Sequence, residues 1–385
     1  MEKKSATRLD IARRAGTSVS VVSRALNNSG YVAKEKKERI LKIAEELNYA
    51  PNPVAISLQK RRTRQILFYC RNVDNAFNMQ LYKGMLDAAA DRGYMVLFNG
   101  KAAFEDLRNT LVDGIIMQDQ GLAAYYLRNY GRNYFLPVVS AAYGEVLGEE
   151  KDSERSAESR TFSRTMPSGR HSVPIVEVDT YRVMETALDY LEHCGHKKIA
   201  FGTPYPAENG NVRTAAFLSR MHERKVKDAR NYILAVSRRD SRLAADSRLL
   251  SFQEEVAENP HVVNEDFFGK GRLAARIFAE RKMDATAVVG FNDEFSLGLI
   301  CGFQEMGLRV PEDISVMGID GNDARKYVSP LLTTVSLFPQ EQGAMCVRVL
   351  LDLIEGKKVR YVTHTGFRLL EGKSVLPCAS AAGIL

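Results

Sequence analysis

The sequence lacks a long apolar run, a paired cysteine motif and an apolar N-terminal segment. No stretch approaches the roughly 18 consecutive apolar residues of a membrane-spanning helix. The five cysteines are scattered and form no Cys-x-x-Cys pair, which argues against a zinc ribbon or a disulfide framework. Residues 1–5 are mostly polar, so no signal peptide is predicted. We therefore expect a protein of the reducing cytoplasm with no membrane segment.

Signatures of catalysis are also scarce. Gly372–Ser374 resembles the end of a phosphate-binding loop, but Phe367 stands where that loop needs a glycine, and Leu376–Pro377 prevents the helix that must follow. His222-Glu223 lacks the second histidine of a zinc protease, because Val226 stands there. The six histidines show no ligand spacing. The sequence predicts that the protein is not an enzyme and needs no cofactor or metal.

The composition is that of a globular protein, and its charge is unevenly distributed. The 385 residues are 45% hydrophobic and 26% charged, enough for two to three domains at roughly 150 residues each. Residues 1–64 carry 15 basic and 6 acidic residues, a net +9, whereas residues 65–385 carry 39 and 41, a net −2, within the total of +7. A basic N-terminal region on a nearly neutral body indicates that this region meets a polyanion.

The basic region has the pattern of a helix-turn-helix. Thr7 can cap a first helix, with Asp10 at its third position, and Gly16 can end it in the left-handed conformation. Ser18 can cap a second helix over 19–26, and a third helix is predicted over 34–47. The expected core of the three helices comprises Leu9, Ile11, Ala12, Ala15, Val22, Ala25, Leu26, Ile40, Leu41, Ile43, Ala44 and Leu47. In such a motif the second helix can enter the major groove of DNA.

Two segments of this region resemble a known headpiece. They are Thr7–Val32, TRLDIARRAGTSVSVVSRALNNSGYV, and Ile43–Asn52, IAEELNYAPN, and they are similar to the DNA-binding headpiece of the lactose-repressor (LacI/GalR) family of bacterial transcription regulators. The residues at the start of the second helix lie closest to the groove floor. The DNA-binding residues expected in the headpiece are Val19, Ser20 and Arg24 for bases, Ser18 and Ser23 for phosphate contact or capping, and Thr7.

The segment Pro53–Gln59 resembles the hinge helix of the same family. The resemblance implies that the hinge folds on operator DNA and that Leu58, with Ala55 beside it, wedges into the central minor groove. An apolar wedge that unstacks a base step is a known minor-groove device. An ordinary linker with a buried leucine remains the alternative.

From residue 65 onward, short apolar strands alternate with amphipathic helices, which indicates an α/β fold with parallel sheets. Helices are predicted over 81–92, 104–111, 122–130, 183–193, 213–224, 271–280, 295–306 and 340–354. This body resembles the two-lobed periplasmic-binding-protein-like core of the family, most clearly over Met306–Asp320 and Ser329–Val335. The resemblance implies three crossings between lobes, near 178, 337 and 363.

The predicted domains follow from these segments. They are a helix-turn-helix domain at 1–52, a hinge and linker at 53–64, and an effector-binding and dimerisation core at 65–385. Within the core, the N-lobe covers about 65–178 and 338–362, and the C-lobe about 179–337 and 363–385. Residues 148–172 are rich in serine and charge and are expected to form a flexible surface insertion, and 225–262 is also longer than the family pattern. Ala33 stands where the family usually has a capping serine.

The resemblance also implies an effector site between the lobes. Its expected residues are Arg213, Asp293 and Asp320 on one lobe and the aromatic residues Phe77 and Tyr143 on the other. A guanidinium and a carboxylate suit vicinal hydroxyls or a carboxylate on the ligand. Each residue has a plainer alternative role: Arg213 in a helix-end salt bridge, Asp320 as a turn cap and Phe77 in the core. Ala142 departs from the family, where an acid often stands.

These observations predict a DNA-binding transcriptional regulator, most simply a repressor. The expected partners are palindromic operator DNA, a small effector and a second copy of the chain in a homodimer or higher oligomer. A sugar or sugar derivative is the favoured effector, with a nucleobase-type co-repressor as an alternative. A solute-binding protein with the same core is the alternative from another class, and the DNA-binding headpiece argues against it.

Overall fold

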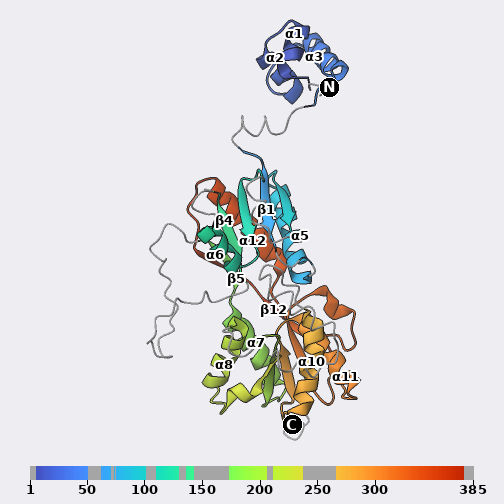
Figure 1. The fold of residues 1–385 in the computed structure, drawn as a ribbon, viewed down its shortest axis with the longest axis vertical. Helices are drawn as coiled ribbons and strands as arrows, with labels where there is room; N and C mark the ends of the chain where they lie inside the picture. Colours follow the sequence, from blue (N-terminus) through green and yellow to red (C-terminus); the bar gives the residue numbers. More distant parts are fainter. Residues whose placement is uncertain are drawn as a thin grey trace. The chain divides into compact units, whose positions relative to one another are not determined.

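The computed structural model describes residues 6–50, 62–70, 73, 75–100, 110–129, 136–142, 173–205, 211–236 and 266–376. The chain divides into two compact units, Met1–Thr63 and Arg64–Leu385 (Figure 1). We call the first unit the headpiece and the second the core. The predicted insertion at 148–172 and most of 225–262 lie outside the described residues.

Three helices form the headpiece: α1 (Arg8–Ala15), α2 (Val19–Asn27) and α3 (Lys34–Glu46). The Thr7 hydroxyl accepts the Asp10 amide, and the Asp10 carboxylate accepts the Thr7 amide at 2.9 Å, which completes a capping box. Gly16 ends α1 with φ +62°, and the Ser18 hydroxyl caps α2 by accepting the Val21 amide. These predicted caps are confirmed. Ala33 precedes α3 without a side-chain cap, also as expected.

The headpiece core is smaller than the sequence pattern suggested. Its buried residues are Ile11, Ala12, Ala15, Val22, Ala25, Ile40, Ile43 and Ala44. Leu9 and Leu41 are 48% and 43% exposed, so their predicted place in the core was wrong. Three short helices can bury only the stripes that face one another, and both leucines lie outside those stripes.

The core contains two six-stranded sheets, each of which defines a lobe. The sheet of the N-lobe has the order β11-β5-β4-β3-β1-β2, and all its pairs are parallel. Its elements are β1 (Gln65–Tyr69), α5 (Ala76–Ala90), β2 (Met95–Asn99), β3 (Gly114–Met117), α6 (Gln120–Asn129), β4 (Val138–Ala141), β5 (Ile175–Val178), α12 (Pro339–Ile354) and β11 (Val362–Thr365).

The sheet of the C-lobe has the order β12-β10-β9-β8-β6-β7, and only β12 is antiparallel to its neighbour. Its elements are α7 (Thr180–His193), β6 (Ile199–Thr203), α8 (Val212–Glu223), the 3-10 helix η2 (Ala229–Tyr232), β7 (Ile233–Ala235), α10 (Phe267–Glu280), β8 (Ala287–Gly290), α11 (Asp293–Glu305), β9 (Ser315–Asp320), the 3-10 helix η4 (Asp323–Lys326), β10 (Thr333–Ser336) and β12 (Arg368–Leu370).

Helices cover both faces of each sheet, as the alternation of strands and helices predicted. In the N-lobe, α5 and α12 pack on the face that holds Phe68 and Val139, and α6 packs on the face that holds Leu67 and Val138. In the C-lobe, α7 and α8 cover one face, and α10 and α11 cover the other. Inner strands such as β3 and β8 are apolar and fully buried because both of their faces are covered, whereas the edge strands β11 and β12 are partly exposed.

Several helices begin earlier than predicted because polar caps precede them. Asn75 caps α5, Asp179 caps α7 and Asn292 caps α11, each by accepting the amide three residues on. The predicted starts, at 81, 183 and 295, took the first apolar residues as the beginning and placed the caps in loops. The helix predicted over 104–111 lies mostly outside the described residues.

The chain passes between the lobes three times: after β5, after β10 and after β11. In each passage the chain leaves a parallel strand at its carboxyl end. The carboxyl edge of each sheet therefore faces the crossings and the other lobe. Ligands of parallel α/β sheets bind beyond the carboxyl ends of the strands, so these two edges are where a core ligand is expected.

Candidate functional site

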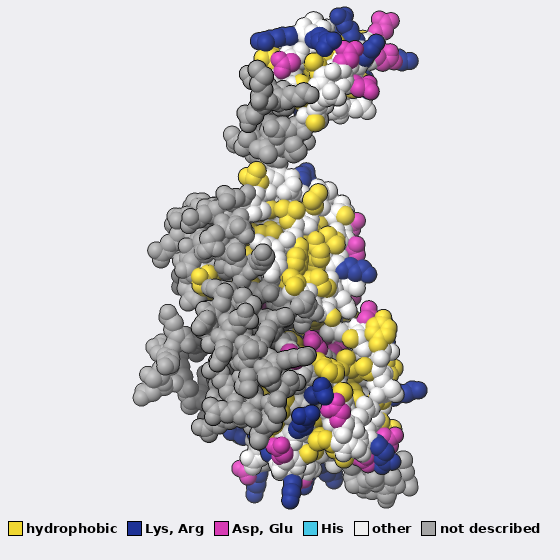
Figure 2. All heavy atoms as spheres, turned by 45° about the vertical axis from the view of Figure 1, so that its right-hand side comes forward, with side chains coloured by type: hydrophobic (Ala, Val, Ile, Leu, Met, Phe, Trp, Pro, Cys, Tyr) yellow, Lys and Arg dark blue, Asp and Glu magenta, His cyan; other side chains and the backbone are white. Residues whose placement is uncertain are grey.

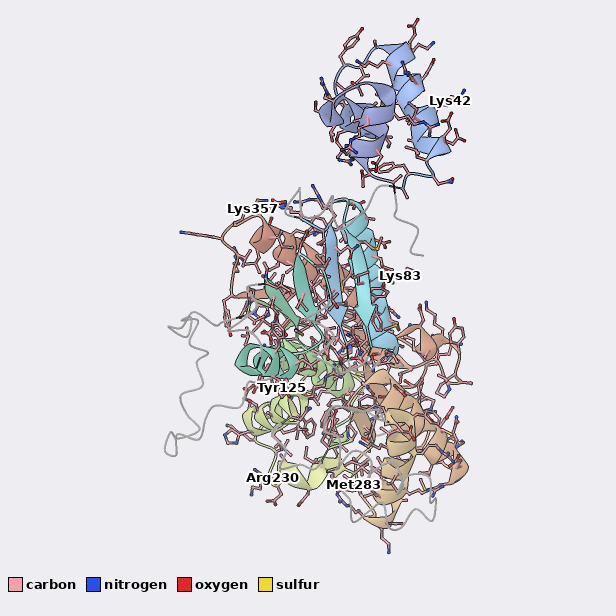
Figure 3. The ribbon with its side chains drawn as sticks, turned by 45° about the horizontal axis from the view of Figure 1, so that its top comes forward. Lys42, Lys83, Tyr125, Arg230, Met283 and Lys357 are labelled. Carbon is pink, nitrogen blue, oxygen red and sulfur yellow. The ribbon has the colours of Figure 1, made fainter. Side chains whose placement is uncertain are left out.

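The outer face of α2 carries most of the residues predicted to read DNA. Ser18, Val19, Ser20 and Arg24 are all exposed, and Val19 is an apolar residue with 40% of its surface open to solvent. The Arg24 Nε bonds to the Ser20 carbonyl oxygen at 3.4 Å, one helical turn earlier. This face offers hydroxyl and guanidinium donors to an anionic partner, and the exposed Lys42 (Figure 3) adds a cation on α3 of the same headpiece.

Two other predicted residues have structural roles in the headpiece. Thr7 is exposed and belongs to the capping box of α1. Ser23 is half-buried, and its hydroxyl accepts Arg8 Nη1 at 3.4 Å, while Arg8 Nε donates to the Tyr49 hydroxyl at 3.2 Å. Arg8 thus connects α1 to α2 and to the segment that follows α3, a link that the sequence analysis did not anticipate.

The remaining predicted residues outside the C-lobe are placed as follows. Ala55, Leu58 and Tyr143 lie outside the described residues. Phe77 is at the start of α5, 2% exposed, and belongs to the apolar core. Its burial favours the core role that the sequence left open.

The C-lobe brings together three charged residues that are far apart in the sequence. Arg213 lies in the first turn of α8, Asp320 ends β9, and Asp293 begins α11. Arg213 Nη2 donates to Asp320 Oδ1 at 2.9 Å, and both side chains are at least 93% buried. Arg213 Nη1 donates to the carbonyl oxygen of Phe291. All three lie at the carboxyl edge of the C-lobe sheet, where a ligand of the core is expected.

Asp293 is fully buried and satisfied by backbone and side-chain donors. Its Oδ2 accepts the Asn322 amide at 2.6 Å, and its Oδ1 accepts the Thr334 hydroxyl. Position 318 in β9 is a glycine, and a Cβ atom there would collide with the Asp293 carboxylate. The strand therefore approaches this carboxylate closely.

The backbone and electrostatics at Asp320 are both unusual. Asp320 has φ +134°, which is a strained conformation for a residue other than glycine, and such strain is common at functional sites. Burial, together with the negative charge of Asp320, raises the pKa of Asp293 to about 7. Burial also raises the pKa of Asp320, while the Arg213 guanidinium opposes this rise.

Two residues of this site were missed by the sequence analysis. Asn322 is 4% exposed, and its side-chain oxygen has no hydrogen-bond partner among the described residues. A buried acceptor without a partner indicates a place for a water molecule or a ligand donor. The Phe291 ring lies against Arg213, with the guanidinium carbon 4.9 Å from the ring centroid. Its position directly after β8 was the signal in the sequence that could have found it.

The three-helix headpiece and the two-lobed α/β core define a DNA-binding regulator with a ligand-sensing body. Residues 7–52 match the family model for bacterial regulatory proteins of the lacI family, and residues 188–375 match the model for a periplasmic binding protein-like domain. Residues 7–52 are therefore a LacI-family DNA-binding domain, joined to a periplasmic-binding-protein-like core, and the chain is a DNA-binding transcriptional regulator.

Characterised proteins resemble the chain over nearly its whole length. The HTH-type transcriptional repressor PurR of Vibrio parahaemolyticus is 27% identical over 369 residues, covering 92% of this chain and 93% of that protein. The HTH-type transcriptional repressor CytR of Escherichia coli is 25% identical and covers 97% of this chain and 96% of its own.

Solved structures agree with the fold. A Lac repressor dimer bound to operator and the anti-inducer ONPF has a TM-score of 0.71 at 20% identity, covering 97% of this chain and 100% of that one. A LacI family regulator from Enterococcus faecium with bound ribose has a TM-score of 0.59 at 20% identity, covering 82% and 99%. Among the described residues, no helix is long and apolar enough to cross a membrane, and no acidic, histidine or cysteine cluster is arranged to hold a metal.

Proposed function

We propose that the protein is a cytoplasmic transcriptional repressor without catalytic activity, which binds palindromic operator DNA as a homodimer and responds to a small effector held in its core. The proposal about DNA rests on one observation: a capped second helix presents Ser18, Val19, Ser20 and Arg24 on an exposed face of a basic headpiece. Arginine can bond two acceptors on the major-groove edge of guanine.

The hinge completes the proposed DNA contact. Leu58, with Ala55 beside it, is the residue proposed to wedge into the minor groove at the centre of the operator, by resemblance to the family. A segment as short as 53–59 gains little stability as an isolated helix, since helices shorter than about 12 residues are marginal in water. Binding to DNA would supply the missing stabilisation.

The proposed effector site is the cluster of Arg213, Asp320 and Asp293, with Tyr143 as a proposed contributor from the N-lobe; the buried Phe77 is assigned to the core instead. Asp320 and Arg213 offer an acceptor beside donors, the pattern that recognises neighbouring hydroxyl groups. Arg213 is paired with Asp320, and the pKa of Asp293 is raised to about 7, so the three groups together carry little net charge near neutral pH. A neutral polyhydroxyl ligand such as a sugar suits this charge better than an anion does. The ribose bound to the related Enterococcus faecium regulator agrees with that chemistry.

The proposed dimer has a candidate surface on the N-lobe. Leu86 on α5 and Met95 at the start of β2 are 41% and 59% exposed. Figure 2 shows apolar side chains gathered on this face of the lobe. Exposed apolar groups of this kind are typical of surfaces that bind another protein.

The DNA proposal is tested by selecting binding sites from random duplexes and measuring the affinity by fluorescence anisotropy at several salt concentrations. We expect a palindromic consensus and an affinity that falls steeply with salt, because phosphate contacts release counterions. A selected pool without sequence preference would contradict specific binding.

The effector proposal is tested by a thermal-shift screen of sugars, nucleosides and nucleobases on the full chain. A ligand that binds the folded state raises the unfolding temperature by mass action. We expect sugars to produce the shift and R213A to abolish it. A shift produced by nucleobases alone would replace the sugar assignment with the co-repressor alternative.

A further inference from the structure

Three contacts hold the Arg213 guanidinium: two come from Phe291 and one comes from Asp320. Its guanidinium lies over the Phe291 ring, with its central carbon 4.9 Å from the ring centroid. Its Nη1 donates to the carbonyl oxygen of the same residue, and its Nη2 donates to Asp320. Phe291 therefore contacts both a face and an edge of the guanidinium.

The Phe291 ring is itself fixed by two other aromatic side chains. Phe267, at the start of α10, lies nearly parallel to it, with ring centroids 5.9 Å apart and an interplanar angle of 17°. Tyr205 meets it edge-on at 5.3 Å and 81°. The ammonium group of Lys270 lies 5.7 Å from the centroid of the Tyr205 ring. A ring packed in this way has little freedom to move, so whatever rests on it is also restricted.

We propose that Phe291 is the positioning residue for Arg213: its ring and its carbonyl oxygen hold the guanidinium in the orientation that meets Asp320 and keeps its remaining donors at the carboxyl edge of the sheet. The contact of Arg213 with Asp320 is observed in the structure. The consequence for a ligand rests on the proposed effector site. Arginine has five N–H donors, and the described contacts use two of them.

Such positioning has a consequence for binding. A long side chain that is ordered before the ligand arrives does not lose its rotamer freedom on binding, which raises affinity by about 2- to 12-fold. The aromatic face also stabilises the cation where water is excluded. An aliphatic side chain of similar volume would keep the carbonyl acceptor but lose the aromatic face.

The first test does not require the effector. Unfolding by urea is measured at pH 8, at fixed protein concentration, for the wild type, F291L, F291Y, R213Q and the double variant R213Q/F291L. The charged groups at this cluster are Arg213, Asp293, Asp320 and Lys270. If the ring holds the Arg213 guanidinium, loss of the ring costs more when Arg213 is present than when it is replaced.

We therefore expect F291L to raise the unfolding equilibrium constant by a factor about 3- to 30-fold larger in the wild-type background than in the R213Q background, because only the former contains the cation that the ring contacts. F291Y, which keeps the ring, should follow the wild type. F291M replaces F291L if the latter does not fold. An equal cost of F291L with and without Arg213, or an F291Y variant as unstable as F291L, would overturn the proposal.

The second test uses ribose as the probe, measured by titration calorimetry on the same full-length variants. We expect ribose affinity to fall about 2- to 12-fold in F291L, because the guanidinium is no longer ordered in advance, and to be retained in F291Y. Unchanged affinity in F291L would overturn the consequence for binding. If the wild type binds no ribose, the ligand class of the proposed function fails, whereas the unfolding test still decides the role of Phe291.

Discussion

The headpiece and the core present their functional residues in opposite ways. On α2, Ser18, Val19, Ser20 and Arg24 are exposed, and the helix is held in place by local caps. In the C-lobe, Arg213, Asp293 and Asp320 are buried and already bonded to neighbouring groups. An exposed site needs only charge and shape to meet a large polyanion. A ligand that enters a buried site has to replace the hydrogen bonds already made there. A ligand that leaves polar groups of the protein unpaired binds weakly, so the site can discriminate among small ligands.

The sharpest test of this division is removal of the headpiece. A chain that begins at Arg64 keeps the whole core unit, so we expect it to keep the effector-induced thermal shift. It should lose specific DNA affinity by about 1,000-fold or more, the usual gap between specific and non-specific binding. Fluorescence anisotropy with the selected operator measures the loss. Comparable operator binding by this shortened chain would show that the core, and not the headpiece, contacts DNA.

Within the headpiece, R24A tests whether the exposed face reads sequence. We expect discrimination between the consensus and a site with one changed base pair to fall by about 1–3 kcal/mol. R39A is the matched control, because Arg39 is an exposed arginine on α3 and its loss removes the same charge. Site selection with both variants measures the effect. If R24A returns the wild-type consensus and R39A does not, the reading face has been assigned to the wrong helix.

Within the core, R213A tests whether the buried cluster senses the effector. We expect the effector-dependent change in operator affinity, about 5- to 150-fold for a coupling of 1–3 kcal/mol, to disappear. DNA affinity without effector should stay close to wild type. R220A on the same helix is the control, because Arg220 pairs with Glu185 and Glu223 away from the cluster. A normal response in R213A at unchanged effector concentration would place the ligand elsewhere.

The buried carboxylate of Asp293 makes a prediction about pH. Its pKa is raised to about 7 in the folded chain, so the folded state binds more protons than the unfolded state between about pH 4 and 7. The core should therefore lose stability as pH rises through this range, by at most about 1.4 kcal/mol per pH unit from this group. D293N should flatten the slope, as measured by urea unfolding from pH 4 to 8. A slope identical to wild type would mean that Asp293 is ionised throughout this range.

The smallest expected effect concerns the cap of α1. T7A removes the hydroxyl of the capping box and should destabilise the headpiece by about 1 kcal/mol. Hydrogen exchange of the amides in α1 measures this loss, with exchange in the core as the internal control. T7S keeps the hydroxyl and should restore protection. Faster exchange in both variants would point to packing of the threonine methyl group instead.

Local signals were the predictable part of the fold. Thr7, Gly16 and Ser18 act through neighbours within three residues, so their roles could be inferred from the sequence. The strand and helix alternation of the core was also predictable, because most of its described strands are apolar and most of its described helices are amphipathic. Leu9 and Leu41 were misplaced because spacing indicates which residues share a face, but not how far the neighbouring helices cover that face.

The candidate site was predictable only in part. Resemblance to the family suggested Arg213, Asp293 and Asp320, and the structure brings these three together. The resemblance did not point to Phe291, which is 78 residues from Arg213. Its position directly after β8 indicates the carboxyl edge of the sheet, but not which side chain it contacts there. The unpartnered oxygen of Asn322 was equally hidden, because satisfaction of a polar group depends on the folded surroundings.

The three passages between the lobes also bear on the order in which the chain can fold during synthesis. The N-lobe sheet is completed by β11 and covered by α12, and the C-lobe sheet is completed by β12, all of which lie beyond residue 338. A ribosome releases the headpiece early, and that unit can fold on its own contacts. Both lobes, in contrast, wait for elements that begin beyond residue 338. The time between the two events leaves a nascent protein with a folded DNA-binding end and an unfinished sensor, which makes the body the slower part to assemble and the part most exposed to misfolding.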